Sequence, residues 1–300
     1  MGTTRRIPTV VFLIAAILVS IGFAGAPMGP PMATLEEGQW GMGAEYGYEQ
    51  IDLEGCGIFD RTLAIGEDVF ADSTVESLEI EDLETNMIFG HLAYGLTDDW
   101  DVFVRFGGAD ARDDATGTTN VVDTSATEDY SLGEIDSDFG FAGGVGTRTT
   151  FYHAGPWRFG GLAQVTWFDP DDSEIQYTEP LAADPDLVHS GMATLEYWQV
   201  QVSLAAIYQV DTWSFWGGPF MQFVDGDFER SGTAVDAVLG DVGEFSADTE
   251  IEQVSWLGAH FGANWNAADQ WDLWVEGQVT GDSWLVGVGA VFLPEDAFGG

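Results

Sequence analysis

The feature that most constrains the fold of this chain is an alternation of large apolar side chains with small or polar ones over many short segments. In the first segment, Trp40, Met42, Ala44, Tyr46 and Tyr48 occupy one side, while glycine, glutamine and glutamate occupy the other. Successive side chains of a β-strand point to opposite faces, so this period of two predicts strands with one apolar face. The same pattern predicts nine further strands at 86–96, 100–108, 138–151, 157–168, 193–208, 212–223, 254–265, 271–280 and 283–293.

The connections between these segments alternate in length. Short turns at one rim of a barrel and long loops at the other are typical of up-and-down barrels in the outer membrane. Ten strands is the best count, with eight and twelve as neighbouring possibilities. The short turns lie at 97–99, 153–156, 210–211 and 267–270, with a last tight connection at Gly281–Asp282. The long polar stretches, which we expect to be loops, cover 51–82, 109–136, 169–191 and 224–252.

Five tryptophans stand at the starts of alternate strands, four of them directly after a short turn. Their spacings along the chain are 60, 57, 56 and 58 residues. An indole combines an apolar ring with one N–H donor and is favoured at the boundary between membrane and water. We therefore expect an aromatic girdle at one rim, and the alternative is a set of core tryptophans in a soluble repeat protein. The girdle residues are Trp40, Trp100, Trp157, Trp213 and Trp271.

The content of the two faces separates a membrane barrel from a soluble one. One face carries bulky side chains such as Trp100, Val102, Val104 and Phe106, for which a small barrel has no interior room. The opposite face is rich in glycine and in small or polar residues, as over 140–148. A small, polar interior and an apolar exterior predict an all-β fold, a closed antiparallel transmembrane β-barrel.

The N-terminus has the pattern of an export signal. A positively charged Arg5–Arg6 pair precedes an apolar stretch over 10–26, in which Gly22/Ala24 and Ala24/Ala26 each offer a small-x-small cleavage site. We place the signal peptide at 1–26, and an uncleaved anchor helix at the short limit for spanning a bilayer is the alternative. The remaining boundaries are an N-terminal linker at 27–37, the barrel at 38–293 and a C-terminal tail at 294–300.

The charge of the chain restricts its partners. Its 51 Asp and Glu residues face eight arginines and no lysine, which gives a formal net charge of −43. Such a surface repels phosphate groups, so we expect no nucleic-acid partner. The predicted loops contain 34 of the 51 carboxylates, so the acidity belongs to the loop side. The single cysteine, Cys56, excludes an intramolecular disulfide and a cysteine-rich metal site.

With these features, the chain resembles the small outer-membrane barrel proteins of Gram-negative bacteria, the OmpA-like and OmpX-like superfamily. The resemblance covers residues 38–293 and rests on the hairpin Tyr94–Trp100, the aromatic rims and the last strand ending in Phe292. It implies localisation in the bacterial outer membrane, with lipid as the main partner and a monomeric state. Members of this superfamily usually end in an aromatic residue that the assembly machinery recognises. Here residues 293–300 follow Phe292, and Phe298 is a second candidate.

A small set of charged residues falls at the alternate strand positions that point toward the interior of the predicted barrel. An unpaired charge in a narrow lumen is costly, so we predict that the arginines point inward and pair with the carboxylates. The network then either plugs the barrel with salt bridges or forms a charged constriction that filters ions. Its members are Arg105, Arg148, Arg158, Glu45, Asp101, Asp272 and Glu276.

Groups that could carry other chemistry are sparse. His91 and His260 share the lumen face, but no nucleophile or acid partner is recognisable beside them, so we expect no enzyme and no cofactor. The run Asp169–Glu174 is the densest acidic cluster. It could bind divalent cations such as Ca²⁺, although its spacing matches no known calcium loop, and a solvated acidic loop is the alternative.

The sequence therefore predicts an integral outer-membrane barrel with acidic surface loops and a structural or surface-interaction role. The alternative is a narrow, porin-like channel for small solutes or cations. A lipid-modifying barrel hydrolase is a third hypothesis from the enzyme class.

Overall fold

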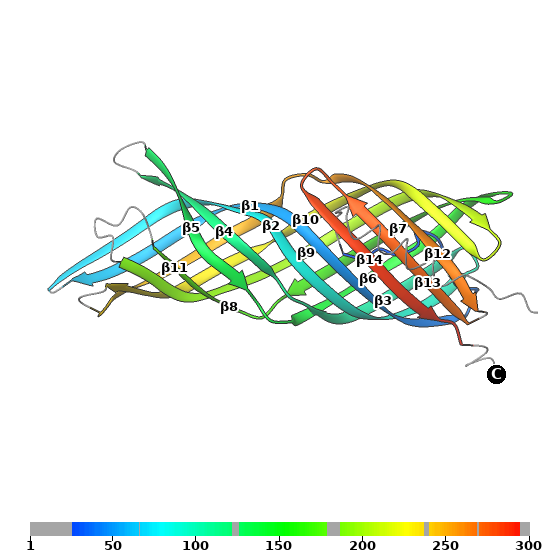
Figure 1. Ribbon diagram of the computed structural model, residues 1–300, viewed down its shortest axis with the longest axis horizontal. Helices are drawn as coiled ribbons and strands as arrows, with labels where there is room; N and C mark the ends of the chain where they lie inside the picture. The colour runs from blue at the N-terminus through cyan, green and yellow to red at the C-terminus, as the bar shows by residue number, and fades with distance from the viewer. Residues whose placement is uncertain are drawn as a thin grey trace, which may run out of the picture.

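The computed structural model describes residues 26–65, 67–121, 126–178, 187–236, 240–268 and 270–294, which form fourteen β-strands (Figure 1). Residues 1–25 of the predicted signal peptide, and residues 295–300 with Phe298, lie outside the described residues. Within the described ranges, no helix is long and apolar enough to cross a bilayer.

Ten of the strands form a closed antiparallel ring in chain order, because the first strand pairs with both the second and the last. The predicted all-β fold, a closed barrel with a ring of about ten strands, is confirmed. The ring consists of β1 (Trp40–Ile65), β2 (Asp68–Thr97), β3 (Trp100–Ala109), β6 (Gly140–Ala154), β7 (Trp157–Asp169), β9 (Leu187–Val210), β10 (Trp213–Asp236), β12 (Leu257–Ala268), β13 (Trp271–Val279) and β14 (Ser283–Phe292).

Four of the predicted short turns lie together at one end of the ring, here called the short-turn rim. They connect β2 to β3 at Asp98–Asp99, β6 to β7 at Gly155–Pro156, and β9 to β10 at Asp211–Thr212. The fourth connects β12 to β13 around Gln270. Gly155 and Asp211 have φ values of 63° and 54°, the left-handed conformation that tight hairpins require.

The prediction that the four long polar stretches are loops was wrong for most of their length, because they continue as paired strands. They contain β4 (Arg112–Val121), β5 (Ala126–Asp136), β8 (Ser173–Thr178), β11 (Gly240–Gln253) and long extensions of β1, β2, β9 and β10. Acidic residues there alternate with apolar ones, as in Leu78–Glu79–Ile80–Glu81. The alternation therefore indicates strands whose outward face is exposed to water.

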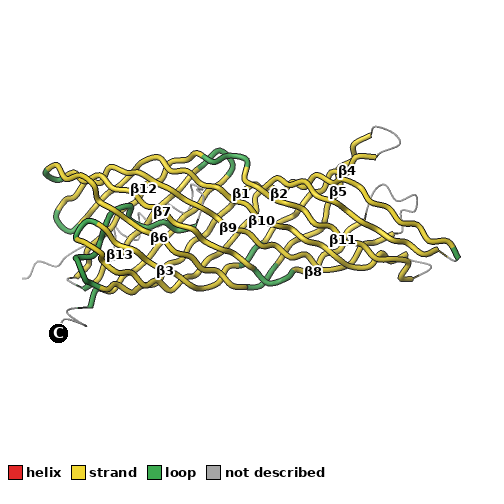
Figure 2. Tube along the Cα trace, turned by 180° about the vertical axis from the view of Figure 1, so that it is seen from behind, coloured by secondary structure: helices red, strands yellow, loops and turns green. Residues whose placement is uncertain are grey.

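These strands prolong the barrel beyond the ring into what we call the extended end, at the left of Figure 1 and the right of Figure 2. There β11 pairs with β1 and β10, β4 pairs with β2 and β5, and β8 pairs with β9. The wall is completed where β5 lies beside β8, with Asp136 N donating to Ser173 Oγ at 2.9 Å. Eight strands enclose this end against ten in the ring, so its interior is narrower.

The interior of the extended end is an apolar core. Its members come from all sides of the wall, and their side chains are almost completely inaccessible to solvent. The largest fully buried ones are Tyr197, Phe89, Phe168, Phe228, Ile51, Leu53, Ile80, Leu83, Met87 and Leu132. The extended end therefore has the organisation of a soluble barrel, apolar within and polar without.

Candidate functional site

Two tiers of aromatic residues border the apolar exterior of the ring. At the short-turn rim, rings pair at 4.8 Å (Trp40 with Tyr94), 4.8 Å (Trp157 with Tyr208) and 5.6 Å (Trp213 with Trp265). The second tier carries outward Trp167, Trp198, Trp256 and Trp284. We call the exterior between the tiers the belt.

The height of the belt fits a bilayer. Trp157 and Trp167 stand ten positions apart on β7. At about 3.3 Å per residue and a tilt of about 40°, this spacing corresponds to about 25 Å along the barrel axis, the height of the apolar band of outer-membrane barrels. Phe106, Phe141 and Val145 are exposed between the tiers. The belt is a surface for hydrocarbon.

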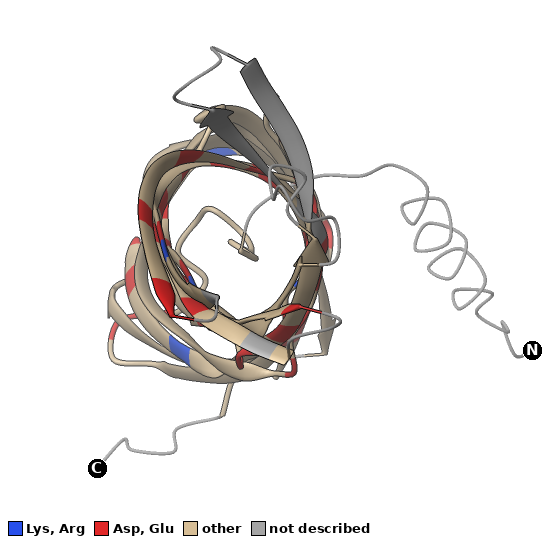
Figure 3. Cartoon of the chain, turned by 90° about the vertical axis from the view of Figure 1, so that its left-hand side faces the viewer, with Lys and Arg blue, Asp and Glu red and all other residues tan. Residues whose placement is uncertain are grey.

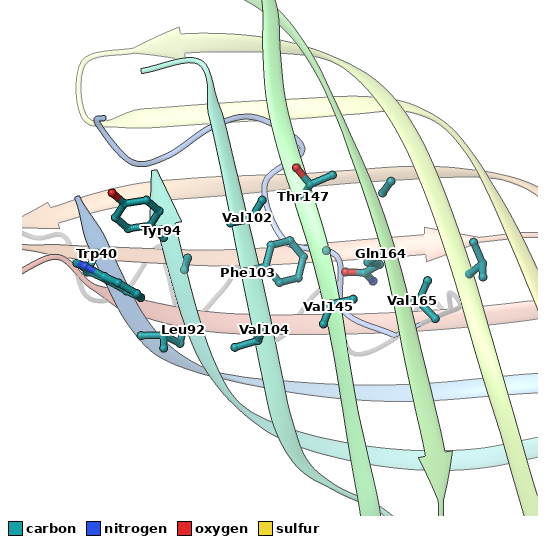
Figure 4. Close-up of a pocket in the computed structure, with 14 residues that line it drawn as sticks. Trp40, Leu92, Tyr94, Val102, Phe103, Val104, Val145, Thr147, Gln164 and Val165 are labelled. Carbon is teal, nitrogen blue, oxygen red and sulfur yellow. The ribbon is translucent and has the colours of Figure 1, made fainter. Parts of the chain in front are cut away.

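The five tryptophans of the predicted girdle all lie at the short-turn rim. Trp40, Trp100, Trp157 and Trp271 are exposed, whereas Trp213 is half-buried and stacked on Trp265. A groove of about 750 Å³ opens on the belt over β2, β3, β6 and β7 (Figure 4). Its lining is almost entirely apolar, with Trp40, Leu92, Val104 and Val165 among the residues.

The lumen inside the belt is occupied by the chain itself. Residues 26–35, here called the N-terminal segment, run inside the ring before β1 begins, and nearly all of them are buried. Figure 3, viewed from the extended end, shows this coil inside the circle of strands. The predicted linker at 27–37 thus lies mostly within the barrel.

Side chains of the lumen wall hold the N-terminal segment through its backbone. Glu276 accepts hydrogen bonds from Met28 N at 2.6 Å and from Gly29 N at 3.0 Å. Farther along the segment, Thr150 Oγ1 accepts from Ala33 N at 3.2 Å, and Asp101 Oδ2 accepts from Thr34 N at 2.8 Å. A coil without secondary structure has backbone donors that need partners when buried, and these residues supply them.

Two of the predicted lumen arginines meet carboxylates. Arg105 lies 3.3 Å from Glu45 and also donates to Thr166 and to the carbonyl of Pro27. Arg148 contacts Asp101 at 2.8 Å. Both guanidinium groups also lie over aromatic rings, Phe89 for Arg105 and Phe103 for Arg148. All four charged side chains are buried, so their pairing offsets a large desolvation cost.

Three members of the predicted network differ from the expected pairing. Arg158 is half-buried near the short-turn rim and forms no ion pair with the described residues, because solvent reaches that rim. Asp272 accepts from Asn266. Glu276 bonds to backbone N–H groups and not to an arginine, because the N-terminal segment brings the donors.

A layer of glutamines, which the charge-based reasoning missed, crosses the lumen at the inner tip of the N-terminal segment. Gln201 Nε2 donates to Gln222 and Gln278, each at 2.9 Å, and Gln164 donates to Gln201 at 2.5 Å. Their inward parity was visible in the sequence, but their mutual contacts depend on strands far apart in the chain. His91 and His260 are buried beside Phe103 and Phe220. No group of three or more His, Cys, Asp or Glu among the described residues could hold a metal ion.

The core of the extended end contains a fully buried ion pair. Arg230 on β10 donates to Glu76 on β2, and it also lies 3.5 Å from Tyr177 Oη. His189 stacks on Tyr177 with ring centroids 5.0 Å apart, and Phe245 meets His189 edge-on at 5.0 Å. The pair joins strands on different sides of the wall inside an aromatic environment.

The outer face of the extended end is acidic. In the register of the sheet, Glu250 lies between Cys56 and Asp227, and Asp227 lies opposite Glu196. Adjacent rows place Glu252 opposite Asp225, and Asp248 opposite Glu229. Elsewhere on this exterior, Arg112 pairs with Asp136 at 2.7 Å, and that hydrogen-bonded carboxylate raises the pKa of Arg112.

No protein family matches the sequence, and neither does any curated protein. Three solved structures to which the chain is similar are bacterial outer-membrane barrel proteins. The outer membrane protease OmpT of Escherichia coli is 9% identical, with 85% of this chain and 97% of that chain covered and a TM-score of 0.44. OprG of Pseudomonas aeruginosa is 12% identical (87% and 98% covered, TM-score 0.40). The translocator domain of the autotransporter NalP of Neisseria meningitidis is 12% identical (95% and 94% covered, TM-score 0.35).

Proposed function

We propose that this protein is an integral outer-membrane barrel with a sealed bore, which anchors an acidic, strand-built extension outside the bilayer. The observation that supports this proposal is that buried parts of the chain lie inside both regions of the barrel. The N-terminal segment occupies the lumen inside the belt, and the apolar core occupies the extended end. Ala26, at the tip of the N-terminal segment, belongs to the same buried cluster as Leu53, so the segment is in contact with the apolar core of the extended end.

The extended end is the part that would meet partners. Its outer face carries carboxylates in facing pairs over β1, β9, β10 and β11, with the like charges only a strand spacing apart. Such a face attracts cations, divalent ones included, and basic surfaces, and it repels nucleic acid. The role is structural or one of surface interaction, performed by a monomer whose belt is covered by lipid. The proposal assigns no catalytic role.

Ion flux tests the sealed bore. The purified mature protein, inserted into planar bilayers, is expected to give no stepwise conductance, while a porin inserted in the same way serves as the positive control. Insertion is checked by protease protection of the belt strands in vesicles prepared from the same sample. Sustained conductance steps of the unaltered protein would overturn the sealed-anchor function in favour of a narrow channel.

A deletion of residues 27–35 shows which filling carries the seal. Conductance in the deletion variant alone would locate the seal in the N-terminal segment. Continued silence would show that the core around Phe168 and Tyr197 closes the bore by itself.

A further inference from the structure

The first described residue, Ala26, is buried in the lumen and hydrogen-bonded to its wall, like the residues that follow it. Its backbone N donates to Gln199 Oε1 at 2.8 Å, and its carbonyl accepts from Gln278 Nε2 at 3.0 Å. Its side chain is completely buried in the apolar cluster. Both glutamines are themselves buried, so loss of Ala26 would leave two polar groups without these partners.

A mature chain beginning at Pro27 would create a second conflict. The carbonyl of Pro27 accepts a hydrogen bond from Arg105. The new charged nitrogen of Pro27 would stand only three covalent bonds from that oxygen, so two positive charges would share one buried corner. Like charges in a low-dielectric interior repel strongly.

We propose that export processing cuts between Ala24 and Gly25, so that the mature chain begins at Gly25 and retains the buried Ala26. Hydrolysis breaks that peptide bond, with water supplying the hydroxyl of the Ala24 carboxylate and a proton of the Gly25 amine. This is the Gly22/Ala24 site of the two small-x-small sites in the sequence. The boundary of the signal peptide moves from 26 to 24.

The surroundings of Ala26 N suit a positive chain end. Gln199, which accepts from this nitrogen, donates through Nε2 to Glu49 Oε1 at 3.2 Å. The carboxylate at the end of these two hydrogen bonds favours a positive charge near Ala26 N.

Seating of the N-terminal segment therefore follows processing. The inference rests on the proposed export to the outer membrane but not on the sealed bore. In the precursor, the apolar stretch would still sit in the membrane where the chain is exported. Two residues span about 7 Å, so Ala26 cannot reach the barrel lumen while residue 24 remains in that membrane.

The composition provides an unusually clean test, because the chain contains no lysine. A mature chain beginning at Gly25 has a single primary amine, whereas one beginning at Pro27 has only a secondary amine. Fluorescamine becomes fluorescent with primary amines alone. We expect about one equivalent of label per chain in denaturant, whereas a chain that begins at Pro27 would give none. N-terminal sequencing and intact mass of the same sample should give a start at Gly25.

The control is Ser246→Lys, which adds one primary amine on the exposed outer face of β11 and should raise the label to about two equivalents per chain in denaturant. A start at Pro27 or Met1 would overturn the proposal. These readouts are independent of conductance, so a leaky bore and a wrong cleavage site are distinguishable.

A single substitution separates the two cleavage sites in cells. Ala26→Val removes the small residue that cleavage after residue 26 requires, and it leaves Gly22 and Ala24 unchanged. We expect unaltered processing together with a lower melting temperature, because the added methyl groups have no room at a fully buried position. Accumulation of the precursor would contradict the proposal.

Discussion

The belt region and the extended end are built from the same strands with opposite chemistry. On β1, the inward residues change from Glu45 and Glu49 in the belt region to Ile51 and Leu53 beyond it. The outward residues change from exposed Met42 and Tyr46 to acidic residues such as Glu54. Pairing and alternation are the same in both regions. The surrounding solvent, hydrocarbon or water, therefore decides which half of an alternating strand faces outward.

The change of chemistry coincides with a change of neighbours. β1 pairs with β14 up to Ile51 and with β11 from Leu53 onward. Its register with β2 shifts at the same point, where Asp82 has a left-handed φ of 63°. An extra residue in one strand bends the pair, so a β-bulge marks the transition between the two regions.

The largest expected effect concerns the buried pair of the extended end. Glu76→Gln removes the negative charge of a fully buried ion pair with Arg230, at a cost of about 3–5 kcal/mol in the free energy of unfolding. Denaturant titration in lipid vesicles measures this. The double change Glu76→Leu with Arg230→Met should recover most of the loss, because an apolar core tolerates an apolar replacement. A double variant as unstable as the single one would show that the pair is essential to the core.

Two valines of equal exposure test the difference in outer chemistry directly. Val145 in the belt is 57% exposed, and Val75 on the extended end is 58% exposed. Val145→Arg places a guanidinium in hydrocarbon and should cost about 2–4 kcal/mol, while Val75→Arg should change stability by less than about 0.5 kcal/mol. Unfolding in vesicles compares the two. Equal costs would contradict the assignment of the belt.

A smaller effect is expected from loosening the N-terminal segment in the lumen. Glu276→Gln replaces one of the two oxygens that accept from Met28 N and Gly29 N with an amide NH2 group, so a buried N–H loses its partner at a cost of about 1–3 kcal/mol. Thermal unfolding in detergent measures the loss. The control Glu252→Gln lies on the exposed outer face of β11 and should leave the melting temperature unchanged. The same drop in both variants would argue that Glu276 has no role in holding the segment.

The smallest effect has the opposite sign. Asp227→Asn removes one charge from a row in which Asp227 faces Glu250 on one side and Glu196 on the other. We expect a gain of about 0.2–1 kcal/mol at low salt, because like charges directly opposite on a sheet repel. The gain should vanish at high salt, where the repulsion is screened. A gain that persists in high salt would indicate a cause other than charge.

Much of the ring could be predicted from the sequence, because its strands are short, amphipathic and separated by turn residues. Trp100, Trp157, Trp213 and Trp271 directly follow the short turns, so the predicted starts of β3, β7, β10 and β13 are accurate to within one residue. The sequence-based prediction misses the extended strands, because high acidity is also typical of loops. The alternation of Leu78 and Ile80 with acidic residues was nevertheless present.

The lumen was less predictable than the ring. The alternation of side chains along the strands predicts that Arg105 and Arg148 point inward. It cannot show that Glu276 binds backbone N–H groups of residues almost 250 positions away. The N-terminal segment has no periodic pattern, because it is a coil whose conformation is set by the wall around it. Its position depends on contacts that only the closed ring creates.

Four strands, β1, β2, β9 and β10, run without interruption from the short-turn rim to the far end of the molecule. The continuous hydrogen bonding between these strands couples the extended end rigidly to the ring, with no hinge between the two. A sideways load applied at the tip would be carried as tension and compression along these strands into the bilayer, tilting the whole barrel. A partner that grips the extended end therefore pulls on the membrane itself.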